Sequence, residues 1–295
     1  MVTRIVELTG GLGNQMFQYE FGRYLQKRYP ADIIKYDLSY FSARNSIRDF
    51  ALGKAFGIVP EAANVKEIRK VRGYSPYDGK VMKLLSGIVT KKAKIPFEVV
   101  EDLDREFSED YVGSETDTYY SGYWQNEKVF SSFREEVLKD YNVSDEFPCE
   151  LTELLQEIKD TEAVAVHVRL EDYLQDNNYK VYGGICTREY YEKAISYITE
   201  NVQEPVFYLF STDLDSAREY LPDGIECHQM SYKGQRDYLD MYLMSRCKHH
   251  IIANSTFSWW GAWLNRREDK IVVCPGRWFN NHDVYNQYCD GWIRI

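Results

Sequence analysis

The sequence lacks the marks of several specialised protein classes. Its six cysteines include no CxxC pair, so neither a zinc ribbon nor a thioredoxin-like motif is indicated, and we expect reduced structural thiols. Only 8 prolines occur in 295 residues and 44% of the residues are hydrophobic, which excludes a disordered or fibrous chain. Basic residues are outnumbered by acidic ones, 36 against 46. The resulting net charge of −10 disfavours a protein that binds duplex nucleic acid or anionic lipid.

Long apolar runs are also missing. No stretch approaches 18 consecutive apolar residues, and no basic segment followed by an apolar one occurs at the N-terminus. We therefore expect a cytoplasmic protein without a transmembrane span or signal peptide. The length suffices for two ordinary domains.

The first part of the chain predicts a strand, a glycine loop, a helix and a second strand. Residues 2–8 are β-prone, glycines follow at positions 10, 11 and 13, and an apolar stripe over residues 17–25 favours a helix. Residues 32–36 read as the next strand. Residues 41–111 show no clear pattern, and the polar stretch 142–148 is the predicted linker.

The second part alternates strands and helices. This alternation predicts a parallel sheet covered on both faces, with ligands at the carboxyl ends of its strands. Together the two parts predict an α/β, GT-B-like fold in which two Rossmann-like domains, residues 1–148 and 149–295, face a cleft. The strands expected in the second domain are residues 163–168, 206–210, 225–230, 249–253 and 271–274.

The glycine loop is an incomplete dinucleotide motif. Met16 stands where a third glycine is expected, and no GxxxxGK[ST] string of a phosphate-binding loop occurs. Two interpretations stay open: a loop that faces a ligand, and a tight turn in which Asn14 and Gln15 cap the helix.

A histidine and an arginine lie near the carboxyl end of a predicted strand. His167 and Arg169 are two residues apart, so they project to one face while Val168 points into the packing. A guanidinium at this position can hold two oxygens of a diphosphate. The alternative is a surface ion pair of Arg169 with Glu171 or Asp172.

Hydroxyl residues open a helix near the end of the chain. Asn254, Ser255, Thr256 and Ser258 follow a strand, where side-chain hydroxyls and helix amides form either a simple cap or a phosphate cradle. The rest of that helix is apolar nearly all round, so its three tryptophans are expected to be mainly core residues.

Two DxD strings could hold a divalent ion. Asp102 with Asp104, and Asp213 with Asp215, are the pairs. Asp213 begins a helix after a strand, where the helix dipole alone favours an acidic residue. Hydrogen bonds to a nucleoside and metal binding are both open as roles for Asp213. The adjacent His249–His250 pair faces opposite sides of a strand and cannot readily share an ion.

Four strings, in this order and spacing, resemble a known family. GGLGNQMFQY, HVRLEDY, FSTDLD and ANSTFSWWGAWL are similar to the motifs of the bacterial α-1,2-fucosyltransferases of glycosyltransferase family eleven. The resemblance implies a GT-B arrangement, inversion at the fucose anomeric carbon and no required metal or other cofactor. It also implies GDP-fucose as donor substrate and a terminal β-galactoside as acceptor, with residues 1–148 on the acceptor side and residues 149–295 binding the GDP-sugar.

The same resemblance assigns roles to individual residues. Arg169 corresponds to the arginine at the donor diphosphate, whereas Leu170 replaces the family's second arginine and Glu171 its glycine. The resemblance assigns no general base. Asp172 and Glu171 are candidates because they lie close to Arg169 in the sequence, and Asp172 with Arg169 makes up the predicted catalytic pair. The predicted donor-binding residues are Asn14, Gln15, His167, Arg169, Asp213, Asn254, Ser255, Thr256 and Ser258.

Three other functions fit parts of the sequence. A nicotinamide-dependent oxidoreductase would account for the glycine loop and for Asp37 beyond the second strand. A non-catalytic carbohydrate-binding protein would account for 15% aromatic residues and for Leu170. A metal-dependent glycosyltransferase would use Asp213 and Asp215.

Overall fold

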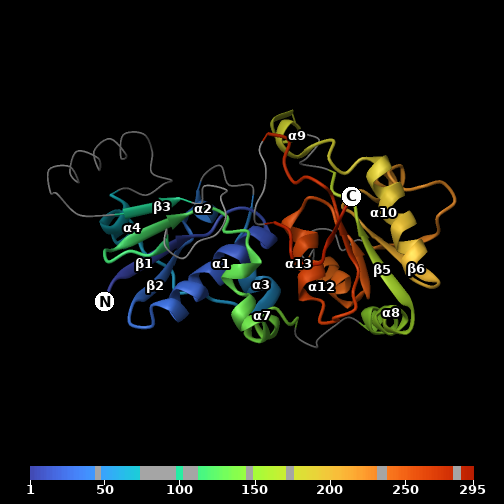
Figure 1. The fold of residues 1–295 in the computed structure, drawn as a ribbon. Helices are drawn as coiled ribbons and strands as arrows, with labels where there is room; N and C mark the ends of the chain where they lie inside the picture. The colour runs from blue at the N-terminus through green and yellow to red at the C-terminus, as the bar shows by residue number, and fades with distance from the viewer. Residues whose placement is uncertain are drawn as a thin grey trace. The chain divides into compact units, whose positions relative to one another are not determined.

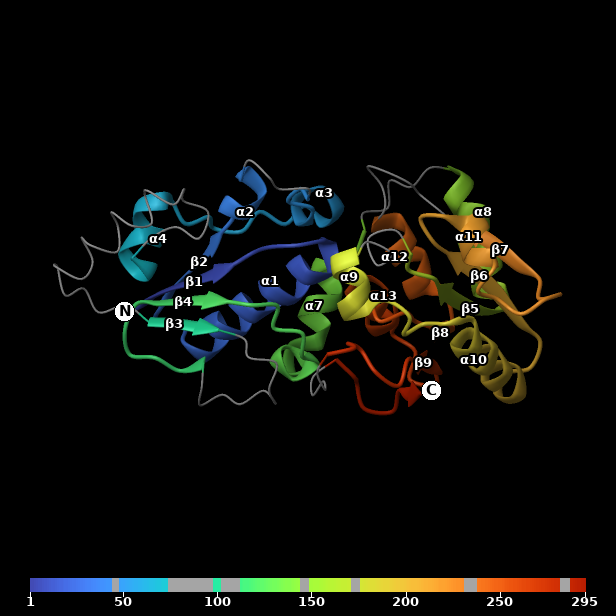
Figure 2. The same ribbon diagram turned by 90° about the horizontal axis from the view of Figure 1, so that it is seen from above.

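The chain forms two compact units, Met1–Asp140 and Tyr141–Ile295. The computed structural model, shown in Figures 1 and 2, describes residues 1–43, 48–73, 98–101, 112–143, 149–170, 176–230, 238–281 and 287–295. The division falls before the predicted boundary at residue 148, and residues 144–148 of the predicted linker lie outside the described residues. Each unit has one parallel sheet with helices, which confirms the predicted α/β class with two Rossmann-like units.

The first unit contains a four-stranded sheet. Its strand order is β2-β1-β4-β3, and every pairing is parallel. The strands are β1 (Thr3–Glu7), β2 (Ile33–Asp37), β3 (Glu98–Glu101) and β4 (Thr118–Ser121). The helices are α1 (Leu12–Arg28), α2 (Ser39–Ser42), α3 (Leu52–Phe56), α4 (Val65–Arg72) and α7 (Arg134–Asp140), with 3₁₀ turns η1 (Glu127–Val129) and η2 (Ser131–Phe133).

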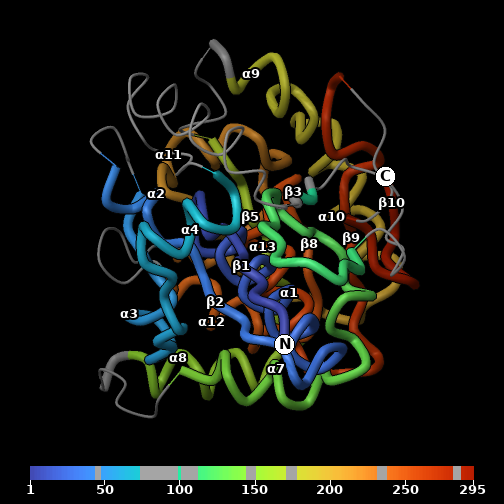
Figure 3. Tube along the Cα trace, turned by 90° about the vertical axis from the view of Figure 1, so that its left-hand side faces the viewer, coloured from blue at the N-terminus to red at the C-terminus, as the bar shows by residue number. Residues whose placement is uncertain are grey.

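Two helices cover opposite faces of this sheet. Phe21 of α1 stacks on Trp124 with ring centroids 3.8 Å apart and meets the Tyr120 ring of β4 edge-on at 5.4 Å, so α1 buries its apolar stripe against one face. On the other face, Ile68 and Val71 of α4 pack against Ile5. Figure 3 shows both helices beside the strands. The predicted strand, glycine loop, helix and strand at the start of the chain are confirmed.

The second unit contains a six-stranded parallel sheet in the order β10-β9-β8-β5-β6-β7. The strands are β5 (Glu162–His167), β6 (Pro205–Phe210), β7 (Cys227–Met230), β8 (His249–Ile251), β9 (Val272–Cys274) and β10 (Ile293–Arg294). The helices are α8 (Cys149–Asp160), α9 (Asp176–Tyr182), α10 (Arg188–Asn201), α11 (Leu214–Arg218), α12 (Tyr238–Arg246) and α13 (Thr256–Leu264).

The core of the second unit is continuous from strand to helix. Buried Val164 and Val166 of β5 pack with Ile195 and Ile198 of α10. As expected from the apolar pattern of α13, Trp259, Trp260 and Trp263 are buried. The free thiols that the structure describes are Cys186, Cys227, Cys247, Cys274 and Cys289. None of the described helices is both long and apolar enough to cross a membrane.

A close helix-strand contact in the first unit gives a test of this packing. A Cβ on Gly22 of α1 would lie 2.2 Å from the Tyr36 hydroxyl oxygen. Alanine normally favours a helix by about 1 kcal/mol over glycine. We nevertheless expect Gly22→Ala to lower the free energy of unfolding by about 1–3 kcal/mol, because the Tyr36 ring must shift.

Urea denaturation measures this effect, and Gly53→Ala in α3 is the matched control. A Cβ on Gly53 meets its nearest atoms at 3.4 Å, an ordinary contact. Equal or greater stability of Gly22→Ala relative to wild type would contradict the packing of α1 on β2.

Candidate functional site

The strand order of the second unit reverses between β5 and β8. From β5 the chain adds β6 and β7 on one side, then crosses to add β8, β9 and β10 on the other. In open parallel sheets, ligands bind outside the carboxyl ends of the strands at such a reversal. Because Val166 of β5 pairs with Ile251 of β8, the segments that follow both strands leave the sheet at this point.

The sheet brings the predicted donor-binding residues of this unit to one edge. Arg169 follows β5, Asp213 follows the neighbouring β6, and Ser255 follows β8 on the other side. The rings of His167 and Phe257 lie with centroids 5.9 Å apart, so the carboxyl end of β5 contacts the first turn of α13, which follows β8. The arrangement therefore places Arg169 and the N-terminus of α13 at the same edge of the sheet, at the reversal point.

The N-terminus of α13 combines a serine cap with the positive end of the helix. Ser255 is the N-cap, and its hydroxyl accepts a hydrogen bond from the Phe257 amide at 3.4 Å. The Ser258 hydroxyl donates to the Ser255 carbonyl at 3.4 Å, and Thr256 is half-buried between them. The simple helix cap, one of the two interpretations of these hydroxyl residues, is therefore present. The positive end of the helix still favours an anion, as the phosphate-cradle interpretation requires.

The Asn254 amide holds three segments around this N-terminus. Asn254 is 2% exposed, and its Nδ2 donates to the Tyr182 carbonyl at 3.2 Å and to the Trp278 carbonyl at 3.0 Å. Its Oδ1 accepts from the Cys186 thiol at 3.4 Å. These contacts give Asn254 a positioning role beside Ser255.

His167 ends β5 as a buried and uncharged imidazole. Within the described residues its Nδ1 is buried without a hydrogen-bond partner. Burial, with a smaller contribution from the charge of Arg169, lowers its pKa from 6.5 to about 3. At neutral pH this histidine adds no positive charge to the edge where Arg169 lies.

The residues after His167 alternate between the two faces. Val168 and Leu170 are buried in the apolar core, whereas Arg169 is half-buried. Leu170, which stands where the resemblance implies a second arginine, is therefore a core residue. The candidate bases Glu171 and Asp172 lie outside the described residues.

Asp213 caps α11. Its Oδ1 accepts from the Ser216 amide at 3.2 Å, and its Oδ2 accepts from the Ser216 hydroxyl at 2.7 Å. The other half of this DxD pair, Asp215, is exposed. In the part of the chain that the structure describes, no three His, Cys, Asp or Glu side chains gather around a possible metal ion. The pair Asp102 and Asp104 lies outside the described residues.

The glycine loop of the first unit lies at a second reversal point. The chain adds β2 on one side of β1 and β4 on the other, and the loop follows β1. Gly10 has a φ of 76°, and Gly11 is the N-cap of α1 without a side-chain cap. The half-buried Asn14 accepts a hydrogen bond from Gln125 Nε2, at 3.1 Å, beyond the end of β4.

The buried side chain of Gln15 holds this loop by hydrogen bonds. It is fully buried, and its Nε2 donates to the carbonyls of Gly10 at 2.9 Å and Asp49 at 3.0 Å. Its Oε1 accepts from the Ala51 amide at 2.8 Å. The side chain thus makes three hydrogen bonds to the backbone, which is a third role beside the two that the sequence left open.

Gln18, which no sequence motif singled out, acts in a similar way. Its buried amide accepts from the Thr9 amide at 2.8 Å and donates to the Gly122 carbonyl at 2.8 Å. It therefore ties together the segments after β1 and β4. The signal that could have found it is a polar residue beside Phe17 and Phe21 on a buried helix.

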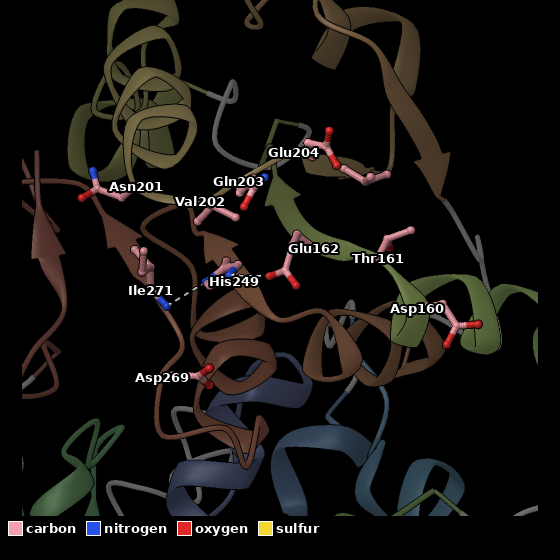
Figure 4. Close-up of a pocket in the computed structure, with 11 residues that line it drawn as sticks. Asp160, Thr161, Glu162, Asn201, Val202, Gln203, Glu204, His249, Asp269 and Ile271 are labelled. Carbon is pink, nitrogen blue, oxygen red and sulfur yellow. Dashed lines mark hydrogen bonds and ion pairs between the residues drawn. The ribbon is translucent and has the colours of Figure 1, made fainter.

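A separate hollow lies at the amino ends of the strands in the second unit (Figure 4). It encloses about 770 Å³ and is lined by carboxylates that include Glu162 and Asp269. His249 Nδ1 accepts from the Ile271 amide at 3.0 Å, which places the ring proton on Nε2, 3.4 Å from Glu162. His250 instead contacts Asn265, so the two histidines face different partners, as expected. This hollow is at the wrong end of a parallel sheet for the predicted ligand.

Two known proteins resemble nearly the whole of this chain, and a third resembles about half of it. The family described as Glycosyl transferase family 11 matches residues 97–295. An O-antigen biosynthesis glycosyltransferase, WbnK, from Escherichia coli is 30% identical, covering 98% of this chain and 99% of that protein. An alpha-1,2-colitosyltransferase from Escherichia coli is 29% identical over 99% and 98%. A galactoside alpha-(1,2)-fucosyltransferase 1 from Leontopithecus chrysomelas is 27% identical over 49% and 42%.

The buried imidazole predicts a pH dependence of stability. The unfolded chain takes up a proton at His167 as the pH falls through 6.5, whereas the folded protein takes it up only near pH 3. Stability is therefore lost as the pH falls between these values. Between pH 7 and pH 5 we expect the wild type to lose about 2 kcal/mol more free energy of unfolding than His167→Gln.

Urea denaturation at the two pH values measures this difference. Comparison with the variant removes the contribution of His250, whose pKa burial also lowers. Equal losses in the two proteins would mean that burial does not lower the pKa of His167 in the folded state.

Proposed function

The chain belongs to glycosyl transferase family 11, and we propose that it transfers L-fucose from GDP-fucose to the 2-hydroxyl of a terminal β-galactoside. One observation carries the donor side of this proposal. Arg169 and the N-terminus of α13 leave neighbouring strands at the reversal point of the second unit. An arginine and a helix N-terminus at such a point are suited to a diphosphate.

The second unit is proposed to bind the donor. The Arg169 guanidinium can form two charge-assisted hydrogen bonds with diphosphate oxygens, and Thr256 and the first amides of α13 add donors from the other side. Charge accumulates on the diphosphate as its bond to the sugar breaks. Donors already in place for that charge lower the barrier of the transfer step.

The reaction is a single displacement at the anomeric carbon. The acceptor 2-hydroxyl oxygen forms a bond to this carbon as the bond to the GDP oxygen breaks, through an oxocarbenium-like state with inversion. The hydroxyl proton passes to a base, for which Asp172 and Glu171 are the candidates. We assign the acceptor side to the first unit.

The relatives agree on the type of linkage but differ in the sugar that is transferred. The colitosyltransferase and the galactoside fucosyltransferase both carry α-1,2 in their names. The former matches nearly the whole chain, which favours transfer of colitose as a second candidate function. Family membership removes the support for a nicotinamide-dependent oxidoreductase, and turnover separates an enzyme from a non-catalytic carbohydrate-binding protein.

A transfer assay tests the function. Incubated with GDP-fucose and lactose, or with other sugars ending in Galβ1,3 or Galβ1,4, the protein is expected to yield a product heavier by one fucosyl residue in mass spectrometry. Digestion by a linkage-specific α-1,2-fucosidase checks the position. The rate is expected to persist in excess EDTA, since the proposed charge stabilisation comes from the protein.

GDP-colitose in a parallel reaction distinguishes the two donors. Product from GDP-colitose alone would replace fucose by colitose in the proposal. Loss of all activity in EDTA, with recovery in Mn²⁺ or Mg²⁺, would favour the metal-dependent mechanism through Asp213 and Asp215.

Removal of the Arg169 guanidinium tests the mechanism. We expect Arg169→Ala to lower kcat/KM by about 10²- to 10³-fold, as for the loss of one preorganised donor to a developing anion, while the protein stays folded. Arg169→Lys keeps the charge but loses the two-pronged geometry, so we expect only partial recovery.

The matched control is Arg267→Ala. Arg267 pairs with Asp269, which lies at the amino edge of the same sheet, and we expect wild-type turnover from this variant. Near wild-type turnover by Arg169→Ala would refute the assignment of Arg169 to the diphosphate.

A further inference from the structure

The proposed donor site has little positive charge for an anion of this size. His167 is neutral and Leu170 is an apolar core residue, so Arg169 provides the positive charge of residues 167–170. The protein as a whole carries −10. If the proposed function holds, a second cation on the other side of the reversal point would complement Arg169.

Arg277 leaves the sheet at the same edge. It comes three residues after β9, and β9 pairs in parallel with β8 through Ile251 and Val273. The segment 275–278 after β9 therefore emerges beside residues 252–255 after β8. Arg277 and Ser255 thus follow adjacent strands of one sheet.

Hydrogen bonds fix the backbone on both sides of Arg277. The Gly276 amide donates to the Ile295 carbonyl at 2.6 Å, and the Trp278 carbonyl accepts from Asn254 Nδ2 at 3.0 Å. Further along, the Asn280 amide donates to the Val181 carbonyl at 2.8 Å. The residue that precedes the N-cap of α13 therefore holds the residue that follows Arg277.

The Arg277 side chain is exposed, and within the described residues it makes no ion pair or hydrogen bond. Other arginines of this unit have partners: Arg188 pairs with Glu192, Arg267 pairs with Asp269, and Arg218 donates to the Ile225 carbonyl. An arginine on a fixed backbone, without an internal partner and beside a helix N-terminus, is available to an anion at this edge.

We propose that Arg277 is a second cationic contact of the donor diphosphate, on the β9 side of the reversal point. Arg169 approaches the diphosphate from the segment after β5, and Arg277 approaches it from the segment after β9. The amides of α13 lie between these segments. Arg277 thereby determines affinity for nucleoside diphosphates more than affinity for the nucleoside itself.

Calorimetric titration with GDP, and separately with guanosine, tests this role in the full-length protein. We expect Arg277→Gln to weaken GDP binding about 10- to 100-fold, the effect of losing hydrogen bonds to a charged group, and to leave guanosine binding unchanged. Arg277→Lys is expected to retain part of the GDP affinity. Arg267→Gln, which removes an exposed arginine that pairs at the amino edge, is the control and should bind GDP like wild type.

Each outcome separates this inference from the proposed function. Failure of the wild type to bind GDP would refute the proposed function itself. Wild-type binding together with unchanged binding by Arg277→Gln would refute only the role of Arg277. An equal loss for GDP and guanosine would place Arg277 at the nucleoside and also overturn the inference. Circular dichroism and the Tm of each variant check that it is folded.

Discussion

The parallel pairing of β5 with β8 is the constraint on which the candidate site depends. Val164 pairs with His249 and Val166 with Ile251, which sets where the chain leaves each strand. A slip of one residue would turn the valines of β5 to the face where the smaller Ala163 and Ala165 are buried, and would turn Arg169 to the face now taken by Val168. The buried valines therefore determine the position of the arginine, since their burial fixes the register.

Buried amide side chains hold the loops at both reversal points. Gln15 joins the glycine loop to residues 49–51, and Asn254 joins the start of α13 to Tyr182 and Trp278. A loop at the end of a strand has backbone groups without sheet partners, and these must be satisfied when buried. A carboxamide can do this in both directions because it donates and accepts. Gln15 and Asn254 therefore fix the loops of the candidate site through side-chain hydrogen bonds to the backbone.

The sequence predicts the framework because the framework is local. Alternating strands and helices, and the two-residue spacing of His167 and Arg169, follow from periodicity, and the buried Val168 confirms the predicted face. The same spacing applied one step further would have placed Leu170 in the core. Gln15 and Asn254 could not be interpreted this way, because their partners lie far along the chain. The pKa of His167 likewise depends on burial by segments distant in sequence.

The neutrality of His167 constrains any account of donor binding. An imidazolium next to Arg169 would face both desolvation and a like charge, so the folded protein disfavours it. Extra positive charge for a diphosphate must then come from a group that stays hydrated until the ligand arrives. An exposed arginine meets this condition, because its charge is stable in water and its planar donors match phosphate oxygens. In a protein of net charge −10, such local cations create an attractive region within an overall repulsive field. The placement of charge at the carboxyl edge of the second sheet, rather than the total charge, is what would permit this protein to hold an anionic donor.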